Sequence, residues 1–353
     1  MPQMQIAFLN LQLILIMELK RLSIGTRHIM RAKTKKKICV VGAGKWGMNH
    51  IRTLNELGAL GAVVDQNSNL LRIIKDLYPH CDVFNDLSKA LQINFDGYVI
   101  ATPPSSHYSL GKQVINARKP VLIEKPFTLD YASAKKLNDL AKKENVKIMV
   151  GHVLLFHPAF IKMKEIIDSG SIGNIQYLYS NRLNLGTFRS DENVFWSFAP
   201  HDISLFNYFL GESPLSISSQ GVDILQKNIH DITLASFKYS KNRMGHIFVS
   251  WLHPFKEHRF IIVGSEGMLS FEDSANSKPL VLYDKKAEFV NSMPNEKIGK
   301  NQNILYDNVS PLKNELKYFI SNIDSNGFNI SSGDSAVEVI KILEEASESL
   351  TKF

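Results

Sequence analysis

The sequence predicts an α/β protein with a doubly wound parallel sheet of the Rossmann type in its first half and a largely antiparallel open sheet in its second half. Short apolar segments alternate with helical patterns as far as about residue 150, which is typical of a parallel sheet. Beyond that point, strand-like segments follow one another through polar or glycine-bearing links, as in hairpins. We therefore predict a basic leader over residues 1–35, a cofactor domain over 36–150 and a substrate and oligomerisation domain over 151–353.

The charge of the chain is confined to its beginning. The net charge is +7, and residues 1–37 hold eight lysines and arginines against one acid, so the rest of the chain carries no net charge. A basic face for nucleic acid is therefore not expected.

The leader lacks the marks of a membrane anchor. Its apolar run, residues 6–17, is shorter than a membrane span and is interrupted by Asn10 and Gln12. We expect it to lie outside the fold, with Met30 as an alternative start, and a transit peptide is the second interpretation. The two cysteines, Cys39 and Cys81, favour a reducing compartment, so we predict a cytoplasmic protein with no membrane partner.

A glycine-rich turn follows the first predicted strand, residues 38–41. Gly42, Gly44 and Gly47 have G-x-G-x-x-G spacing, and a helical pattern follows them. The first glycine allows the tight turn, the second lets a pyrophosphate approach the backbone, and the third lets the helix pack on the strand. Phosphate oxygens would then meet the N–H groups at the helix N-terminus. Lys45 and Trp46 lie within this turn and are further candidates for cofactor contact.

The second predicted strand ends at Asp65, 23 residues after Gly42. A carboxylate at about this spacing reaches the ribose hydroxyls of an adenosine. It would repel a 2′-phosphate, and the neighbouring Gln66 and Asn67 supply no arginine to bind one. The predicted cofactor is therefore NAD rather than NADP.

Two later strands also end in polar residues. Thr102 and Pro103 lie where the strand segment of residues 97–104 ends in a proline loop, and Glu124 and Lys125 close the strand segment of residues 119–126. Ligands of doubly wound sheets bind beyond the carboxyl ends of the strands, so these residues are candidate cofactor contacts. We predict no metal site, because the histidines are scattered and no metal-binding motif occurs.

The segments GAGKWG, ATPPSSH and EKPF, with a later PHD, together resemble the Gfo/Idh/MocA oxidoreductase family, from about Lys36 to the C-terminus. The resemblance implies NAD(P)-dependent chemistry on sugars, cyclitols or sugar nucleotides. It adds His107 to the candidate cofactor contacts and places Lys125 beside the nicotinamide and the substrate hydroxyl. It also implies that one face of the second sheet meets the cofactor and that the other forms an oligomer. The partners that the resemblance implies are therefore a small-molecule substrate and further copies of the chain, as a homodimer or homotetramer.

Lys125 and His201 are the predicted catalytic residues. A desolvated lysine can relay a proton near neutral pH, although Glu124 beside it opposes the shift, so the sequence leaves the direction of the pKa change open. His201 precedes an apolar helical pattern that ends at Gly211, and we expect the helix to begin near Pro200. A histidine at a helix N-terminus stays neutral and can accept the hydroxyl proton. The alternative makes His201 a core or capping residue, with Asp202 as a first-turn partner of the helix dipole.

Ser197 departs from the family pattern, because many relatives with this histidine have an aspartate four residues before it. Asp202 or Glu192 could supply the missing carboxylate, or Ser197 could reflect another substrate or a loss of activity.

The candidate substrate ligands are arginines, histidines and polar residues of the second domain. Arginine binds phosphate bidentately, so a pair of arginines could hold the diphosphate of a nucleotide sugar, although solvated loop charges are an equally good reading. One of the two histidines in GHVLLFHP, His152 or His157, could contact substrate. The full set is Arg182, Arg189, His157, Ser197 and Asp202.

The leading functional hypothesis is a dehydrogenase of a sugar hydroxyl, such as C3 of a UDP-N-acetylated sugar, because the NVFW-x-x-APHD segment is most similar to family members from surface-glycan pathways. Two alternatives remain open: a redox-neutral enzyme that retains NAD and a non-catalytic regulator that senses NAD or a sugar. Ser197 is the feature that favours a regulator, whereas the presence of Lys125 and His201 argues against it.

Overall fold

The computed structural model describes residues 36–186 and 188–350 of the 353-residue chain. The predicted leader, residues 1–35, lies outside the described residues. In the described part of the chain, no helix is both long enough and apolar enough to cross a membrane.

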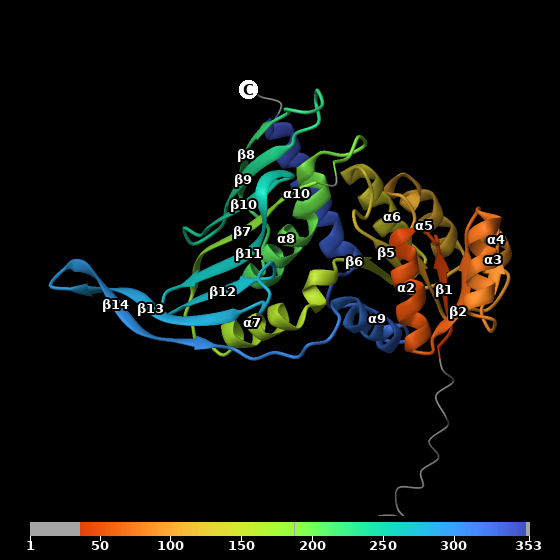
Figure 1. The fold of residues 1–353 in the computed structure, drawn as a ribbon, viewed down its shortest axis with the longest axis horizontal. Helices are drawn as coiled ribbons and strands as arrows, with labels where there is room; N and C mark the ends of the chain where they lie inside the picture. Colours follow the sequence, from red (N-terminus) through yellow and green to blue (C-terminus); the bar gives the residue numbers. More distant parts are fainter. Residues whose placement is uncertain (1–35, 187, 351–353) are drawn as a thin grey trace, which may run out of the picture. The chain divides into compact units, whose positions relative to one another are not determined.

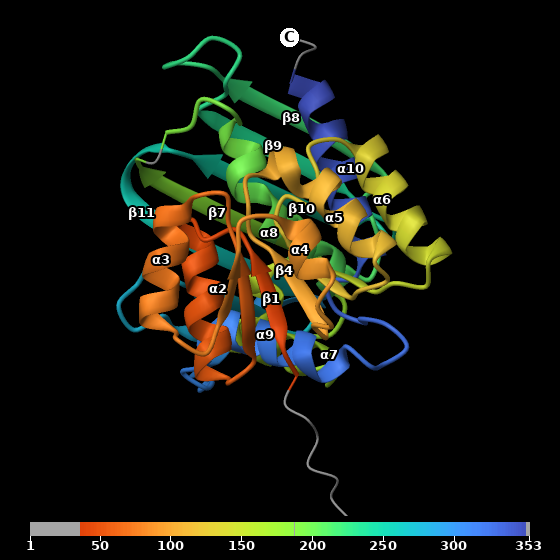
Figure 2. The ribbon, with the colours of Figure 1, turned by 90° about the vertical axis from the view of Figure 1, so that its right-hand side faces the viewer.

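The first sheet contains six parallel strands in the order β3-β2-β1-β4-β5-β6. Its neighbouring strands β1 and β4 are labelled in Figure 2. All residues of its central strands are buried, because helices cover the sheet, and this explains their continuous apolar sequences. The strands are β1 (Ile38–Val41), β2 (Leu60–Val64), β3 (Asp82–Phe84), β4 (Gly97–Ile100), β5 (Val121–Glu124) and β6 (Ile148–Gly151). The helices are α2 (Lys45–Glu56), α3 (Ser68–Leu77), α4 (Leu87–Leu91), α5 (His107–Asn116) and α6 (Tyr131–Lys143), with short 3₁₀ turns η1 (Pro104–Ser106) and η2 (Val153–Phe156).

The strand order of the first sheet reverses between β1 and β4, the first strands of its two halves. Connections leave these strands in opposite directions, so a crevice opens beyond their carboxyl ends, and this is where doubly wound sheets bind nucleotides. Gly42 follows β1 and Thr102 follows β4 at this crevice.

The second sheet has eight strands in the order β14-β13-β12-β11-β7-β10-β9-β8. Its pairs are antiparallel except for β7 with β10. The helices α7 (Pro158–Asp168) and α8 (Val194–Leu210) precede or interrupt the strand series, and α8 packs on β7, β9 and β10 (Figure 1). The strands are β7 (Ile175–Leu185), β8 (Ser216–Val222), β9 (Ile232–Lys238), β10 (Met244–Ser250), β11 (Leu252–Gly264), β12 (Met268–Glu272), β13 (Leu280–Val290) and β14 (Met293–Asn303). The predicted fold class is confirmed in both halves.

The last two helices contact both sheets' helical layers. α9 (Pro311–Asn322) packs against α2 and η2, and α10 (Gly333–Leu350) packs against α6 of the first half and α8 of the second. The main chain of Val150 in β6 donates to the carbonyl of Ser331 at 2.9 Å, which ties this segment to the edge of the first sheet. α10 also packs on β8, so this helix contacts elements of both halves of the chain.

Candidate active site

The three glycines of the first turn meet different surroundings. Gly42 has φ +100°, and a Cβ there would lie 2.7 Å from the carbonyl oxygen of Ala101. A Cβ on Gly47 would lie 2.0 Å from the carbonyl oxygen of Gly42, so this glycine lets α2 close on the turn. At Gly44, however, a Cβ would meet no atom within 4 Å. The protein itself therefore requires Gly42 and Gly47, whereas Gly44 leaves an opening of the kind that a pyrophosphate needs.

Gly44 is also the N-cap residue of α2, and no side chain caps this helix. The first N–H groups of α2 are thus available to an anion, and the helix dipole favours one. The turn fits the pyrophosphate of a dinucleotide on both counts. Lys45 and Trp46 are exposed at this helix start, as expected for residues at the rim of a cofactor site.

Asp65 is fixed by two main-chain donors at the end of β2. Its Oδ2 accepts from the N–H of Ala43 at 2.7 Å, and its Oδ1 accepts from the N–H of Asn67 at 2.8 Å. A cavity of about 590 Å³ opens beside it, and its walls include Gly42, Thr102 and Pro103. No lysine or arginine belongs to the described residues that line this cavity. Its size and charge suit the adenosine end of NAD better than that of NADP.

His107 holds two loops together rather than facing the cavity. Its Nδ1 lies 2.8 Å from the carbonyl oxygen of Pro126, and its Nε2 lies 2.9 Å from that of Thr102. The side chain is fully buried, and burial lowers its pKa. A neutral imidazole has one N–H, so the ring donates to one of these two carbonyl oxygens and only faces the other. His107 thus lies between the loops that follow β4 and β5, and the main chain surrounds both of its ring nitrogens.

Glu124 ends β5 and is the centre of a buried polar cluster. Its Oε1 lies 2.6 Å from His50 Nε2, and its Oε2 accepts from the N–H of Lys125 at 3.1 Å. Burial alone would raise the pKa of Glu124, but the hydrogen bonds and charge of its partners, His50 foremost, outweigh burial and lower it. Glu124 is therefore an anion beneath Lys125. His50, on the buried face of α2, had no signal in the sequence beyond its helical spacing.

Lys125 reaches across from the first sheet to α8. The peptide bond between Lys125 and Pro126 is cis, and the Nζ donates to the carbonyl oxygen of Ser197 at 2.8 Å. Burial lowers the pKa of Lys125, although the charges of Glu192 and Glu124 act in the opposite direction. The structure thus gives the direction that the sequence left open.

His201 lies within α8, not at its N-terminus as predicted. The helix begins at Val194, and Asn193 caps it by accepting from the N–H groups of Phe195 and Trp196 at 3.0 Å. Pro200 is inside the helix, where we expected the start. The Asn193 cap, one residue before an apolar run, was the sequence signal that this prediction overlooked.

The His201 imidazole is neutral, as expected, but the cause is burial and not a position at the helix N-terminus. Burial lowers its pKa well below the ordinary value, and the charges of Lys125 and Arg182 lower it further. Ser197 and His201 are four residues apart and share one face of α8, so the Lys125 ammonium lies one turn from the imidazole. The structure therefore brings the two predicted catalytic residues together.

His152, which follows the last residue of β6, lies beside His201. Its ring meets that of His201 edge to face, with 6.3 Å between the centroids. Burial lowers the pKa of His152 to about 4. Neither nitrogen of His152 nor Nδ1 of His201 has a hydrogen-bond partner among the described residues. Buried polar atoms are rarely left so, and their grouping here marks a binding site.

Asp202, a predicted substrate ligand, is used within the protein. It is fully buried and accepts from Ser180 Oγ at 2.7 Å and from Arg182 Nε at 2.6 Å. The side chain thus anchors α8 to β7 and orients the Arg182 guanidinium. It does not replace the carboxylate that Ser197 lacks.

Glu192 is one of the two acids whose charge raises the pKa of Lys125. It is ion-paired with Arg189, with 3.0 Å between its Oε1 and the Arg189 Nε, and its charge is the largest that raises the pKa of Lys125. Ser197 itself is buried and serves Lys125 through its carbonyl group. Arg182 and Arg189 both lie close enough to lower the pKa of Lys125 by their charge.

His157 has a structural role in place of the predicted substrate contact. Its Nδ1 accepts from the N–H of Ala159 at 3.1 Å, which caps α7. Its ring packs between Phe160, Phe271 and Tyr306. Of the two histidines in this segment, His152 is the one beside His201.

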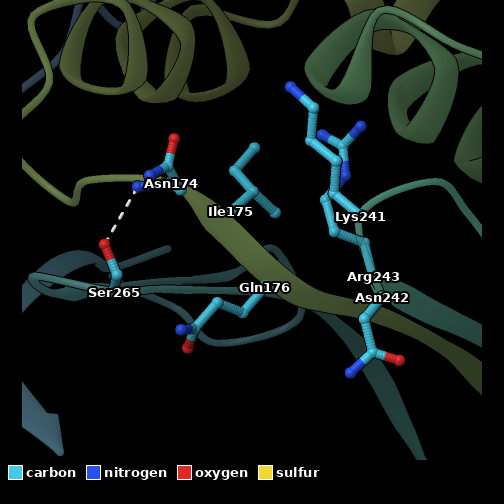
Figure 3. Close-up of a pocket in the computed structure, with 7 residues that line it drawn as sticks. All are labelled: Asn174, Ile175, Gln176, Lys241, Asn242, Arg243 and Ser265. Atoms are coloured by element: carbon cyan, nitrogen blue, oxygen red, sulfur yellow. Dashed lines mark hydrogen bonds between the residues drawn. The ribbon is translucent and has the colours of Figure 1, made fainter.

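A second cavity, of about 550 Å³, lies where β7 begins (Figure 3). It is bounded by Asn174 and Gln176, by the turn from Lys241 to Arg243, and by Ser265, whose Oγ accepts from the N–H of Asn174 at 3.1 Å. None of the predicted site residues lines it, so it is not the catalytic site. Among the described residues, no group of histidine, cysteine and acidic side chains could hold a metal ion.

A dinucleotide turn on a Rossmann sheet, with Lys125 bonded to the helix that carries a buried histidine, is the arrangement of an oxidoreductase of the NAD-binding class. The chain belongs to the Gfo/Idh/MocA oxidoreductase family. Residues 36–152 match the family's NAD-binding Rossmann fold, and residues 160–270 match its C-terminal domain. The predicted family and the NAD cofactor are confirmed.

Several characterised proteins are similar to this chain. A UDP-N-acetylglucosamine 3-dehydrogenase of Acidithiobacillus ferrooxidans is 29% identical over 185 residues, which is 52% of this chain and 57% of that protein. A solved structure of that enzyme has a TM-score of 0.78 at 22% identity and covers 89% of this chain and 97% of the other. A myo-inositol 2-dehydrogenase of Thermotoga maritima is 23% identical over 332 residues, which is 89% of this chain and 96% of that protein.

The WlbA dehydrogenase of Bordetella pertussis, solved in complex with NADH and UDP-GlcNAcA, has a TM-score of 0.72 at 19% identity and covers 89% of this chain and 96% of the other. These structures share the fold. The chain spans about half the length of several curated relatives, such as 57% of the first one named above, so the matches do not fix its substrate.

Proposed function

We propose that this protein is an NAD-dependent dehydrogenase that oxidises a secondary hydroxyl of a nucleotide sugar, such as C3 of a UDP-N-acetylated sugar. The observation that carries the proposal is the juxtaposition of Lys125 and a neutral His201 one helical turn apart. The similarity to a UDP-N-acetylglucosamine 3-dehydrogenase supports the substrate class.

His201 is the proposed base. Oxidation of a carbinol removes a hydride from carbon and a proton from oxygen, and bound NAD⁺ accepts the hydride. The proton needs an acceptor that is unprotonated beforehand. His201 meets this condition, because burial and two neighbouring cations disfavour the imidazolium.

Lys125 is proposed to polarise the same hydroxyl. Its Nζ is held by the Ser197 carbonyl, which leaves two further N–H groups of the ammonium for the substrate oxygen. An ammonium there stabilises the negative charge that develops on oxygen as the proton leaves.

The proposed ligands of the diphosphate are the two arginines. The ion pair with Asp202 uses the Nε of Arg182 and fixes its guanidinium plane, while its terminal nitrogens can bind phosphate oxygens. Arg189 is ion-paired with Glu192, and the charges of both act on Lys125. His258 of β11 lies opposite Arg182 of β7 in the strand register. The two arginines and His258 form the proposed wall of the substrate site.

The test is turnover of the purified protein with NAD⁺ and a panel of UDP-sugars, with myo-inositol as the comparison substrate. The proposal predicts NADH formation with a UDP-sugar and a product two hydrogens lighter by mass spectrometry. NADH formation with myo-inositol alone would overturn the nucleotide-sugar class. No turnover, with tightly retained cofactor, would favour the redox-neutral enzyme or the regulator that Ser197 suggests.

We also propose that the protein is a homo-oligomer through the face of the second sheet that points away from α8. That face exposes Leu234 and Met244, and Tyr179, Ile261 and Met268 line a shallow cavity of about 490 Å³ on it. Light scattering after gel filtration tests this, and a monomer at micromolar concentration would contradict it.

A further inference from the structure

Glu315 is a buried acid that the proposed reaction does not use. It lies on α9 with no exposed surface, and neither carboxylate oxygen has a hydrogen-bond partner among the described residues. An ionised, unpaired carboxylate in such a place is strongly unfavourable, so Glu315 is a neutral acid in the protein without cofactor. Burial raises its pKa well above the ordinary value, and the charge of Glu124 raises it further.

Glu315 lies close enough to Glu124, at the end of β5, for the charge of Glu124 to raise its pKa. The elements packed against α9 are α2, which carries the Glu124 partner His50, and η2, which follows His152. At the surface, Lys313 of α9 pairs with Glu56 at 3.2 Å. Glu124 and Glu315 are therefore two buried carboxyl groups that do not both ionise unless a positive charge is bound near them.

The position of the Glu124 carboxyl group is fixed from the neighbouring strand. A Cβ on Gly151 would lie within 2.9 Å of the Glu124 carboxyl carbon and of both its oxygens. Gly151 pairs with Glu124 across β5 and β6, so the Glu124 carboxyl group lies against Gly151, and His50 contacts one of its oxygens. His50 Nδ1, like both oxygens of Glu315, has no partner among the described residues.

NAD⁺ and NADH differ by one positive charge, which the oxidised nicotinamide ring carries. We propose that Glu315 releases its proton when NAD⁺ is bound and holds it when NADH is bound, so that Glu124 and Glu315 together take up the proton that the oxidation releases. In this reaction the hydride and its two electrons go to the nicotinamide, the hydroxyl proton leaves through His201, and one proton is bound again at Glu315. Glu315 thus balances the charge of the nicotinamide by binding or releasing a proton, and it does not contact the substrate.

The inference rests on the proposed oxidation for its purpose, but its test uses no sugar, so the two can fail separately. Calorimetric titration of NAD⁺ and NADH in two buffers of different ionisation enthalpy measures the protons exchanged on binding. We expect NAD⁺ binding to release more protons than NADH binding, and the affinity ratio of NAD⁺ to NADH to rise with pH, by up to about tenfold per pH unit for one proton.

The decisive variant is Glu315→Gln, which keeps the shape and the neutral form but cannot ionise. It should remove the proton difference and the pH dependence of the affinity ratio. The control is Glu165→Gln, an exposed acid of α7 paired with Lys162, which should leave both unchanged. Equal proton release with the two cofactors in the wild type, or an undiminished difference in Glu315→Gln, would overturn the proposal.

A second measurement needs no variant. The infrared difference spectrum between the NADH and NAD⁺ complexes should show the carbonyl stretch of a protonated carboxylic acid in the NADH complex. A spectrum without such a band would contradict the proposal even if Glu315→Gln failed to fold.

Discussion

The Nζ of Lys125 lies 2.8 Å from the carbonyl oxygen of Ser197, one turn of α8 before His201. This contact joins the cofactor half of the protein to the helix that carries the proposed base. It also gives Ser197 a role that its hydroxyl does not explain, because the main chain of that residue positions the lysine.

Replacement of Lys125 should therefore affect chemistry more than cofactor binding. Lys125→Met keeps the length of the side chain but removes its N–H groups, and we expect turnover to fall by about 10²–10⁴-fold. The affinity for NAD⁺, measured by calorimetry, should change little. Lys135→Met, in an exposed pair with Asp139, is the matched control. Turnover near that of the wild type would show that Lys125 has no catalytic role.

Gly44→Ala separates the cofactor site from the fold. Since a Cβ at Gly44 meets no protein atom within 4 Å, the thermal unfolding midpoint should stay within a degree or two, roughly the spread of neutral surface substitutions. The affinity for NAD⁺ should fall by about tenfold or more, because the methyl group occupies the approach of the pyrophosphate. Unchanged affinity would mean that the pyrophosphate lies elsewhere.

Asp65→Asn tests the choice of cofactor. The amide oxygen can keep one main-chain donor, so the turn should persist, but the charge that repels a 2′-phosphate is lost. Hydrogen bonds to charged groups contribute about 1.5–3 kcal/mol, so the preference for NAD over NADP should fall by about 10–100-fold. An unchanged ratio of kcat/KM for the two cofactors would refute the ribose contact.

The pH profile of kcat/KM reports on His201. The base acts in its neutral form, and its pKa lies well below 6.5. Lowering the pH should therefore leave the rate unaffected through 6.5, with the acid limb appearing only at lower pH. An acid limb at or above 6.5 would be inconsistent with a buried imidazole beside Lys125.

His152 should make the stability depend on pH. Its pKa is about 4 in the folded protein against an ordinary 6.5, so the unfolded chain binds more protons between these values. The free energy of unfolding should fall as the pH is lowered from 6.5 to 4, by up to about 3 kcal/mol from this residue. His152→Phe should flatten this dependence by about one proton in chemical denaturation, and an unchanged slope would contradict the assignment.

Much of the first half was predictable because its signals are local. The glycine spacing and the strand ends are fixed by backbone geometry. The structure places Gly42 and Asp65 at the crevice, and Lys125 follows β5 and contacts α8. The start of α8 was missed because Pro200 was read as a helix beginning, while the Asn193 cap lay seven residues earlier.

The parts that could not be predicted depend on contacts between distant segments. His50 reaches Glu124 across 74 residues, and Glu315, on α9, lies close enough for the charge of Glu124 to raise its pKa. Asp202 and His157 have the residue types of ligands, yet only the packed structure shows that Arg182 and the N-terminus of α7 use them.

The most direct test of the proposed oxidation is label transfer. The purified protein would be given NAD⁺ and UDP-N-acetylglucosamine carrying deuterium at C3, and the cofactor would be analysed by mass spectrometry. The proposed function predicts deuterium in the reduced nicotinamide and slower turnover than with the unlabelled sugar. Reduced cofactor without deuterium would show that another carbon is oxidised, and no reduction with any UDP-sugar would contradict the nucleotide-sugar dehydrogenase itself.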